Sequence, residues 1–213
     1  MIDFKGAIFD LDGTLLDSMW VWEHVDRSFL GRRGIAVPDD YIEIISPIGF
    51  YKAADYTIKR FNLKDSPQDL MDEWNELALD AYSNKVTLKP GAYEYLMSLK
   101  KRGVRLAVAT ASSPDLYEPA LKNNKIYDLF DEIVNLREVS RDKSFPDIYI
   151  HTAQKIEVNA DDCVVFEDIY SAIRGAKSGG FYTVGVYDEY SKKDKEKIIN
   201  NADMFIYSFD ELL

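Results

Sequence analysis

The sequence predicts an α/β fold: a Rossmann-like parallel sheet with helices on both faces, plus an inserted all-helical domain. Over residues 90–213, short apolar runs alternate with helix-like stretches. This alternation is typical of strand–helix–strand units, whose strands pair in parallel. One more apolar run lies near the N-terminus, and a long segment of helical periodicity separates it from the alternating block. That segment is therefore an insertion between the first strand and the rest of the sheet.

Six short runs rich in apolar and β-branched residues indicate the buried strands. The predicted strands are residues 6–9, 104–109, 132–134, 163–166, 182–186 and 204–207. The predicted helices between them are residues 92–102, 114–123, 147–155, 171–178 and 192–201. Boundary residues support this division, because Ser113 and Pro114 are typical of a helix start and Gly103 is typical of a helix end.

The inserted segment has the apolar spacing of helices in three stretches, at residues 20–29, 53–61 and 70–82. Few runs within it resemble strands. We therefore predict two domains. They are an α/β core of residues 1–16 and 90–213, and a helical domain of residues 17–89.

Composition and charge exclude several classes of protein. Of the 213 residues, 46% are hydrophobic and 13% aromatic, which supplies a core and excludes intrinsic disorder. The 26 basic and 37 acidic residues give a net charge of −11, which disfavours nucleic acid and anionic membranes as partners. The single cysteine, Cys163, excludes an internal disulfide, and the apolar run after residues 1–5 is too short for a signal peptide or membrane span. We expect a soluble cytoplasmic protein. The sequence does not indicate its oligomeric state.

The strongest functional pattern is the stretch Asp10-Leu11-Asp12-Gly13-Thr14, directly after the first predicted strand. Residues two apart in an extended chain face the same way, so Asp10 and Asp12 project together. Paired carboxylates suit phosphoryl transfer, in which one attacks phosphorus and the other gives a proton to the leaving oxygen and later takes one from water. An ordinary Asp-Gly turn is the alternative interpretation.

Two further candidates follow later strands. Thr110 ends the strand at 104–109, and its hydroxyl could donate to a phosphoryl oxygen, while Ser113 fits the cap of the next helix. Lys143 precedes the helix at 147–155 and could neutralise charge near the first carboxylate. The alternative for Lys143 is an ordinary surface lysine.

Glu167 and Asp168 end the strand at 163–166, where an acidic residue could also cap a helix. The carboxyl ends of parallel strands share one edge of the sheet, and ligands bind there at a topological switch point. We therefore expect all of these polar residues to meet at that edge. Their oxygen-rich chemistry suits Mg²⁺, which binds one or two carboxylates, a substrate phosphate and several waters.

These residues, in this order, resemble the four motifs of the haloacid dehalogenase-like (HAD) superfamily. The helical insertion resembles the cap of its β-phosphoglucomutase-like phosphatase branch, and the similarity covers the full chain. The resemblance implies a magnesium-dependent phosphatase, a phosphoric monoester hydrolase. Its substrate would be a small phosphorylated metabolite, a sugar phosphate or similar, hydrolysed through an aspartyl-phosphate intermediate.

The resemblance also implies a role for each motif residue. Asp10 would be the nucleophile and Asp12 the general acid/base, while Thr110 and Lys143 would hold the phosphoryl group. The lysine motif of the family commonly reads Lys-Pro-x-Pro-Asp, whereas this chain has Lys-Ser-Phe-Pro-Asp at residues 143–147. The departure keeps the lysine but changes its loop.

The same resemblance implies the ligands of Mg²⁺. They would be the Asp10 carboxylate, the backbone carbonyl of Asp12 and the Asp168 carboxylate. Glu167 would lie close to the ion or assist through water.

The inserted domain bears on substrate choice. Mutases of this branch carry a histidine twelve residues after the nucleophile, where this chain has Trp22, so we predict a phosphatase and not a sugar phosphomutase. His24 lies two positions further along a helix, which turns it to the opposite face. Tyr51 and Lys52 follow residues 46–49, where related caps often contact substrate.

Three alternatives lie outside this branch. A phospho-accepting signalling domain of receiver type also combines Asp, Thr, Lys and Mg²⁺, but it needs neither the second carboxylate, Asp12, nor a helical lid. A dehalogenase would need neither Asp12 nor Mg²⁺. A binding protein without catalysis is the third alternative, although every motif residue is present in this chain.

Overall fold

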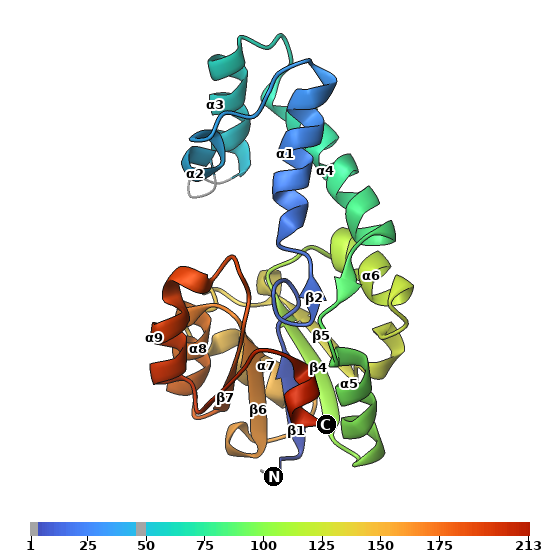
Figure 1. The fold of residues 1–213 in the computed structure, drawn as a ribbon. Coiled ribbons are helices and arrows are strands. Elements are labelled where there is room, and N and C mark those ends of the chain that lie inside the picture. The colour runs from blue at the N-terminus through green and yellow to red at the C-terminus, as the bar shows by residue number, and fades with distance from the viewer. Residues whose placement is uncertain (1–3, 46–49) are drawn as a thin grey trace. The chain divides into compact units, whose positions relative to one another are not determined.

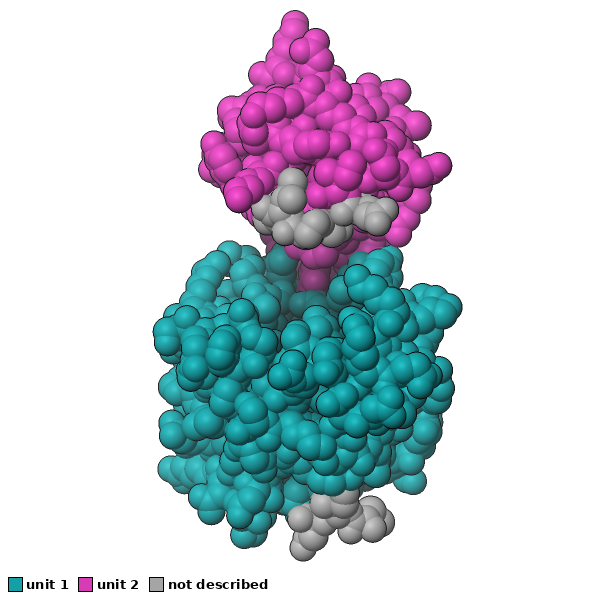
Figure 2. Space-filling view, turned by 90° about the vertical axis from the view of Figure 1, so that its left-hand side faces the viewer, with its two compact units in different colours: residues 1–19, 86–213 teal, residues 20–85 magenta. Residues whose placement is uncertain are grey.

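The computed structural model describes residues 4–45 and 50–213, which form two compact units (Figures 1 and 2). The first unit combines the chain up to Met19 with Val86–Leu213, and the second is Trp20–Lys85. Residues 17–19 and 86–89, which the sequence assigned to the helical domain, thus belong to the first unit. In the described ranges, no helix combines the length and apolar character needed to cross a membrane.

The first unit is built on a six-stranded parallel sheet, which confirms the predicted fold class. In chain order its strands are β1 (Gly6–Phe9), β4 (Arg105–Thr110), β5 (Glu132–Asn135), β6 (Cys163–Glu167), β7 (Tyr182–Val186) and β8 (Met204–Ile206). Their order across the sheet is β5-β4-β1-β6-β7-β8. The chain moves outward from β1 to β5 on one side, and it continues at β6 on the other side. The topological switch point therefore lies at β1.

Helices follow the strands as the sequence predicts. They are α5 (Ala92–Lys101), α6 (Pro114–Asn123), α7 (Asp147–Lys155), α8 (Tyr170–Ser178) and α9 (Lys195–Asn201). The predicted start of the last helix was wrong, because residues Lys192–Asp194 form a 3₁₀ turn before α9. A further 3₁₀ helix, Phe209–Leu212, ends the chain.

Both faces of the sheet are covered, and neighbouring residues of each strand point to opposite faces. On one face Ile8 belongs to a core cluster with Ile148 and Tyr149 of α7. On the other face Phe9 stacks on Phe166, with ring centroids 4.6 Å apart, and Phe209 of the C-terminal 3₁₀ helix packs beside them. The central strand β1 is apolar and buried along its whole length, because neither face of the sheet meets solvent there.

A two-stranded antiparallel ribbon was not predicted. It pairs β2 (Leu16–Asp17) with β3 (Thr87–Leu88) and so joins the two chain segments that connect the units. Two residues are too few to show the alternation of a strand, so the apolar pattern could not reveal it.

The elements described in the second unit are helices, as the sequence predicts. They are α1 (Trp20–Arg32), α2 (Tyr41–Ile45), α3 (Phe50–Phe61) and α4 (Pro67–Asn84). Trp74 of α4 packs against Phe29 of α1 and Phe50 of α3, with centroid distances of 5.7 and 5.4 Å. Ser66 and Asp69 form a capping box that fixes the start of α4.

Several polar side chains of the second unit are hydrogen-bonded to one another. The Tyr41 hydroxyl lies 2.7 Å from Oγ1 of Thr57, and Tyr41 also hydrogen-bonds the buried Asp26. Arg33 donates to Asp65 and to Glu73, each at 2.8 Å. These bonds link the helices and their connections to one another.

Candidate active site

Asp10 stands at the switch point of the sheet. Its backbone N–H donates to the carbonyl of Phe166 at 3.0 Å, which extends the pairing of β1 with β6 by one residue. Its side chain is only 9% exposed. The chain then turns sharply at Gly13, where φ is +85°. A Cβ there would lie 2.6 Å from Oδ2 of Asp168, so glycine is required by both conformation and space.

A cluster of three buried carboxylates forms at this edge. Asp10, Glu167 and Asp168 can each offer one oxygen such that all three oxygens lie within 4.8 Å of one another. The Lys143 ammonium group binds the Asp10 carboxylate and lies 2.6 Å from Oε1 of Glu167. The structure therefore brings together four of the residues that the sequence singled out.

The electrostatics of the cluster reflect burial and crowding. Burial raises the pKa of Glu167 to about 7, with Lys143 opposing the rise and Asp10 adding to it. Burial, reinforced by the charges of Asp10 and Glu167, raises the pKa of Asp168 well above its usual value. Burial also disfavours a charged Lys143, but the two carboxylates outweigh it and raise the pKa of this lysine. The ammonium group is thus the cation that offsets part of the negative charge.

Two carboxylate oxygens of the cluster lack a protein donor. Thr14 donates to Oδ1 of Asp168 at 3.0 Å, and the Tyr149 hydroxyl donates to Oε1 of Glu167 at 2.8 Å. Within the described residues, Oε2 of Glu167 and Oδ2 of Asp168 are buried without a hydrogen-bond partner. Such oxygens are expensive to bury unless a ligand satisfies them. Closely spaced, buried carboxylate oxygens fit Mg²⁺, which prefers oxygen ligands.

Asp12 lies just after the cluster residue Asp10 and is held differently. Its Oδ1 accepts a hydrogen bond of 2.6 Å from Ser18, whose side chain is buried. Ser18 belongs to the segment that leads from β2 toward the second unit. The second carboxylate of the motif is therefore oriented by a residue that sequence reasoning missed.

Thr110 ends β4, the strand beside β1, and is fully buried. Its Oγ1 accepts a hydrogen bond of 3.0 Å from the backbone N–H of Ser112, which leaves its own O–H to donate. Asn135, at the end of β5, donates to the carbonyl of Ser112 and so fixes this loop. Ser113 occupies the N-cap position of α6 as predicted, but its side chain makes no capping hydrogen bond.

The loop that carries Lys143 packs directly on α8. A Cβ on Gly175 would lie 2.1 Å from the Lys143 carbonyl oxygen, closer than any side chain allows. Gly175 therefore permits the approach that brings the lysine to the cluster. Sequence reasoning missed Gly175 and Tyr149, because only the packing of α7 and α8 on the sheet reveals their contacts.

The specificity residues predicted from the insertion lie in the second unit. Trp22 is 39% exposed and packs edge-on against Phe50, with ring centroids 5.6 Å apart. His24 packs against Trp20 at 5.6 Å. Tyr51 and Lys52 are exposed on α3, and the preceding residues 46–49 lie outside the described residues.

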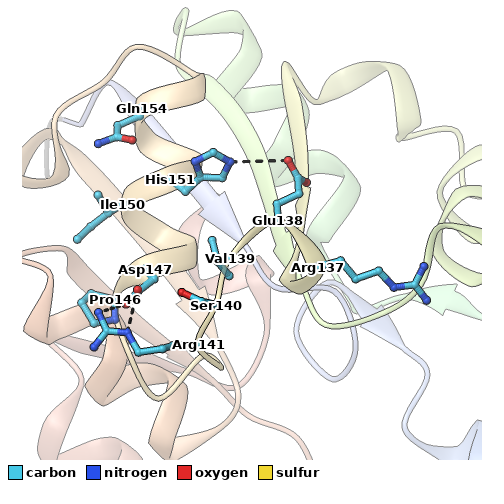
Figure 3. A pocket seen from close by; sticks show the side chains of 10 residues that line it. All are labelled: Arg137, Glu138, Val139, Ser140, Arg141, Pro146, Asp147, Ile150, His151 and Gln154. Atoms are coloured by element: carbon cyan, nitrogen blue, oxygen red, sulfur yellow. Dashed lines mark hydrogen bonds and ion pairs between the residues drawn. The ribbon is translucent and has the colours of Figure 1, made fainter.

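An open pocket of about 630 Å³ in the first unit does not contain the carboxylate cluster (Figure 3). It lies between α7 and the chain before Lys143. Two pairs form among its lining residues, Arg141 with Asp147 and His151 with Glu138 (Figure 3).

Comparisons with known proteins show the family to which this chain belongs. A family model described as haloacid dehalogenase-like hydrolase matches residues 7–186. Hexitol phosphatase A of Escherichia coli is 28% identical over 98% of this chain and 93% of its own length. A phosphorylated carbohydrates phosphatase of Thermotoga maritima is 24% identical over 98% of this chain and 96% of its own. The crystal structure of β-phosphoglucomutase from Clostridium difficile has the same fold, with a TM-score of 0.72, 22% identity, and coverage of 99% of this chain and 93% of that one.

Proposed function

Because this chain belongs to the family of haloacid dehalogenase-like hydrolases, we propose that it is a magnesium-dependent phosphatase. Its substrate is a small phosphorylated metabolite, such as a sugar phosphate, and the reaction passes through an aspartyl-phosphate on Asp10. The observation that carries this proposal is the buried Asp10 carboxylate, which Lys143 binds beside Glu167 and Asp168. The relatives named as phosphatases of hexitols and of phosphorylated carbohydrates support the substrate class.

The proposed reaction has two steps. In the first, a carboxylate oxygen of Asp10 forms a bond to phosphorus while the ester P–O bond breaks, and the leaving oxygen takes the proton of Asp12. In the second, Asp12 removes a proton from a water molecule, whose oxygen bonds to phosphorus as the Asp10–phosphorus bond breaks. Inorganic phosphate leaves, Asp10 is a carboxylate again, and Asp12 is protonated again.

The surrounding residues position and stabilise the charges. Lys143 neutralises negative charge on Asp10 and on the transferring group, and the O–H of Thr110 donates to a phosphoryl oxygen. Asp10, the backbone carbonyl of Asp12 and Asp168 would hold Mg²⁺, with Glu167 beside it. When bound, the ion supplies positive charge that offsets the developing charge on the phosphoryl oxygens.

We propose that the second unit acts as the cap that selects the substrate. Trp22 supports a phosphatase over a sugar phosphomutase, because an indole exchanges no proton with a sugar hydroxyl at neutral pH. Tyr51 and Lys52 are further predicted specificity residues. The single, buried Cys163 supports a location in the reducing cytoplasm.

A screen of phosphorylated metabolites with Mg²⁺, read out as inorganic phosphate, tests the proposal. We expect release from at least one sugar or sugar-alcohol phosphate, and its loss in excess EDTA. Full activity in EDTA, from protein shown to contain no metal, would refute the mechanism.

A second assay separates phosphatase from mutase. It supplies β-glucose 1-phosphate, a trace of glucose 1,6-bisphosphate and Mg²⁺, and follows glucose 6-phosphate and inorganic phosphate together. Glucose 6-phosphate formed well in excess of inorganic phosphate would identify a mutase instead.

A further inference from the structure

A buried ion pair that the proposed reaction does not use lies at the carboxyl edge of the sheet. Nζ of Lys89 is 2.5 Å from Oδ2 of Asp188, and these side chains are 14% and 4% exposed. The lysine also donates to the carbonyl of Tyr187 at 3.3 Å, and Oδ1 of Asp188 accepts from the backbone N–H of Tyr190 at 2.8 Å. Each member of the pair is therefore fixed by two contacts.

Asp188 lies beside the carboxylate cluster. It follows the end of β7 by two residues, and β7 pairs with β6, the strand that carries Glu167 and leads to Asp168. Glu167 is the register partner of Gly185, so Asp168 and Asp188 follow neighbouring parallel strands at the same edge, and the charge of Asp188 makes only a minor contribution to the raised pKa of Asp168. Sequence reasoning had the means to find Asp188, because it follows a predicted strand at the same edge.

Lys89 comes to this edge from a different part of the chain, the segment between the second unit and α5. It follows β3, and its backbone N–H donates to the carbonyl of Leu15 at 2.8 Å. Leu15 belongs to the same turn as Asp12 and Gly13. The pair thus ties the segment after β3 to the end of β7, and it places a second ammonium group beside the site in addition to Lys143.

We propose that Lys89 and Asp188 are a positioning pair that sets the charge at the metal site. Lys89 neutralises Asp188, so that Mg²⁺ and the phosphoryl group meet the charges of the cluster without the added negative charge of Asp188. This inference rests on the proposed function. An uncompensated charge near a bound ligand in a buried site changes the affinity of the protein for that ligand by about three- to tenfold.

Binding measurements on the full chain test the pair without relying on turnover. Isothermal titration calorimetry gives the affinity for Mg²⁺ and, at saturating Mg²⁺, for inorganic phosphate. Lys89→Met, which keeps the length of the side chain, should bind Mg²⁺ about three- to tenfold more tightly and phosphate more weakly by a similar factor. Asp188→Asn should shift both affinities in the opposite directions, and the double variant should return both close to wild type.

The opposite directions of the two affinity changes distinguish an electrostatic role of the pair from a purely structural one. A pair that served only the fold would weaken both ligands in each single variant, with no reversal. Lys89→Arg keeps the charge and should preserve both affinities. If Lys89→Met fails to fold because it leaves a buried carboxylate unpaired, Asp188→Asn still reports the sign, and the double variant still tests the return to wild type.

A more exposed ion pair at the other end of the same strands serves as a control. Lys177 is 2.8 Å from Asp203, which accepts from the backbone N–H of Thr183 near the start of β7. Lys177→Met and Asp203→Asn should leave both affinities unchanged.

The outcomes separate the two proposals. If wild type binds Mg²⁺ but the Lys89 and Asp188 variants shift together or not at all, the pair does not set the charge, and the proposed function stands. If wild type binds no Mg²⁺, the magnesium assignment fails and this inference fails with it.

Discussion

The two units of this protein bury acidic side chains in different ways. In the second unit, the buried Asp26 bonds Tyr41, and Glu73 bonds Arg33. In the first unit, buried oxygens of Glu167 and Asp168 have no hydrogen-bond partner among the described residues. Hydrogen bonds within the unit compensate the burial of the first kind of acid, whereas an open buried oxygen is costly unless a ligand satisfies it.

The two units also assemble their polar groups from different distances in the chain. Asp26 and Tyr41 lie on successive helices of the second unit. Lys143 and Asp10 are 133 residues apart. A parallel sheet makes such distant contacts possible, because every strand delivers its C-terminal residue to one edge. We therefore propose that the catalytic role belongs to the unit with the sheet.

The largest effect is expected at Asp10. Asp10→Asn removes the attacking carboxylate with little change of shape, so turnover should fall by more than about 10³-fold. Thermal unfolding followed by circular dichroism should show a folded protein. If purified Asp10→Asn keeps a substantial fraction of wild-type phosphatase activity, Asp10 is not the nucleophile.

Substitution of Asp12 is expected to reduce turnover less than substitution of Asp10, because general acid/base catalysis typically contributes about 10²–10⁴-fold to the rate. Asp12→Ala should slow the transfer step more for an alkyl phosphate than for p-nitrophenyl phosphate, whose leaving group needs little protonation. Pre-steady-state measurement of the transfer step with both substrates checks this. Equal losses would argue against the acid role. Ser18→Ala, which removes only the hydrogen bond to Asp12, should give a smaller loss of the same kind.

The contrast between the units also explains what the sequence could predict. The sequence alone indicated four of the site residues, because each lies at or near a strand end or in the loop before a helix, and such positions can be recognised from the order of residues. They are Asp10, Lys143, Glu167 and Asp168. Their convergence followed from the parallel sheet alone.

The contacts that support these residues could not be found in the same way. Tyr149 and Gly175 lie within helices, and only the packing of α7 and α8 turns them toward Glu167 and the Lys143 loop. The ribbon of β2 and β3 was missed because two-residue strands leave no periodic pattern.

Gly175 allows a test of how closely the lysine must be placed. Gly175→Ala puts a methyl group 2.1 Å from the Lys143 carbonyl oxygen, so the loop must move. A displacement of about 1 Å in a catalytic group can cost up to about 10²-fold, and we expect kcat to fall by about 10- to 100-fold. Steady-state kinetics with the substrate from the screen would show it. Unchanged kcat would mean that the backbone of Lys143 need not lie so close to α8.

Asp26 should make the stability of the protein depend on pH, and its substitution should leave activity unchanged. Burial, aided by the charge of Glu23, raises the pKa of Asp26 from 3.8 to about 7 in the folded protein. A raised folded-state pKa gives stability that is fully present below the unfolded-state pKa and is lost as pH rises toward 7. Wild type should therefore lose on the order of 2 kcal/mol more than Asp26→Asn between pH 5 and pH 8. Urea unfolding at both pH values measures this difference, and equal losses in the two proteins would contradict it.

The smallest effect is expected at Gly31, the counterpart of Gly175 in the second unit. Gly31 lies in α1, and a Cβ there would meet no atom within 4 Å. Alanine loses less backbone entropy than glycine in a helix, so Gly31→Ala should stabilise the protein by about 0.5–1 kcal/mol, with kcat unchanged. The same substitution thus strengthens the unit without the carboxylate cluster and impairs the unit that contains it. Urea unfolding and steady-state kinetics on both variants measure the contrast. A loss of activity in Gly31→Ala equal to that in Gly175→Ala would show that the effect of Gly175 is not specific to the Lys143 loop.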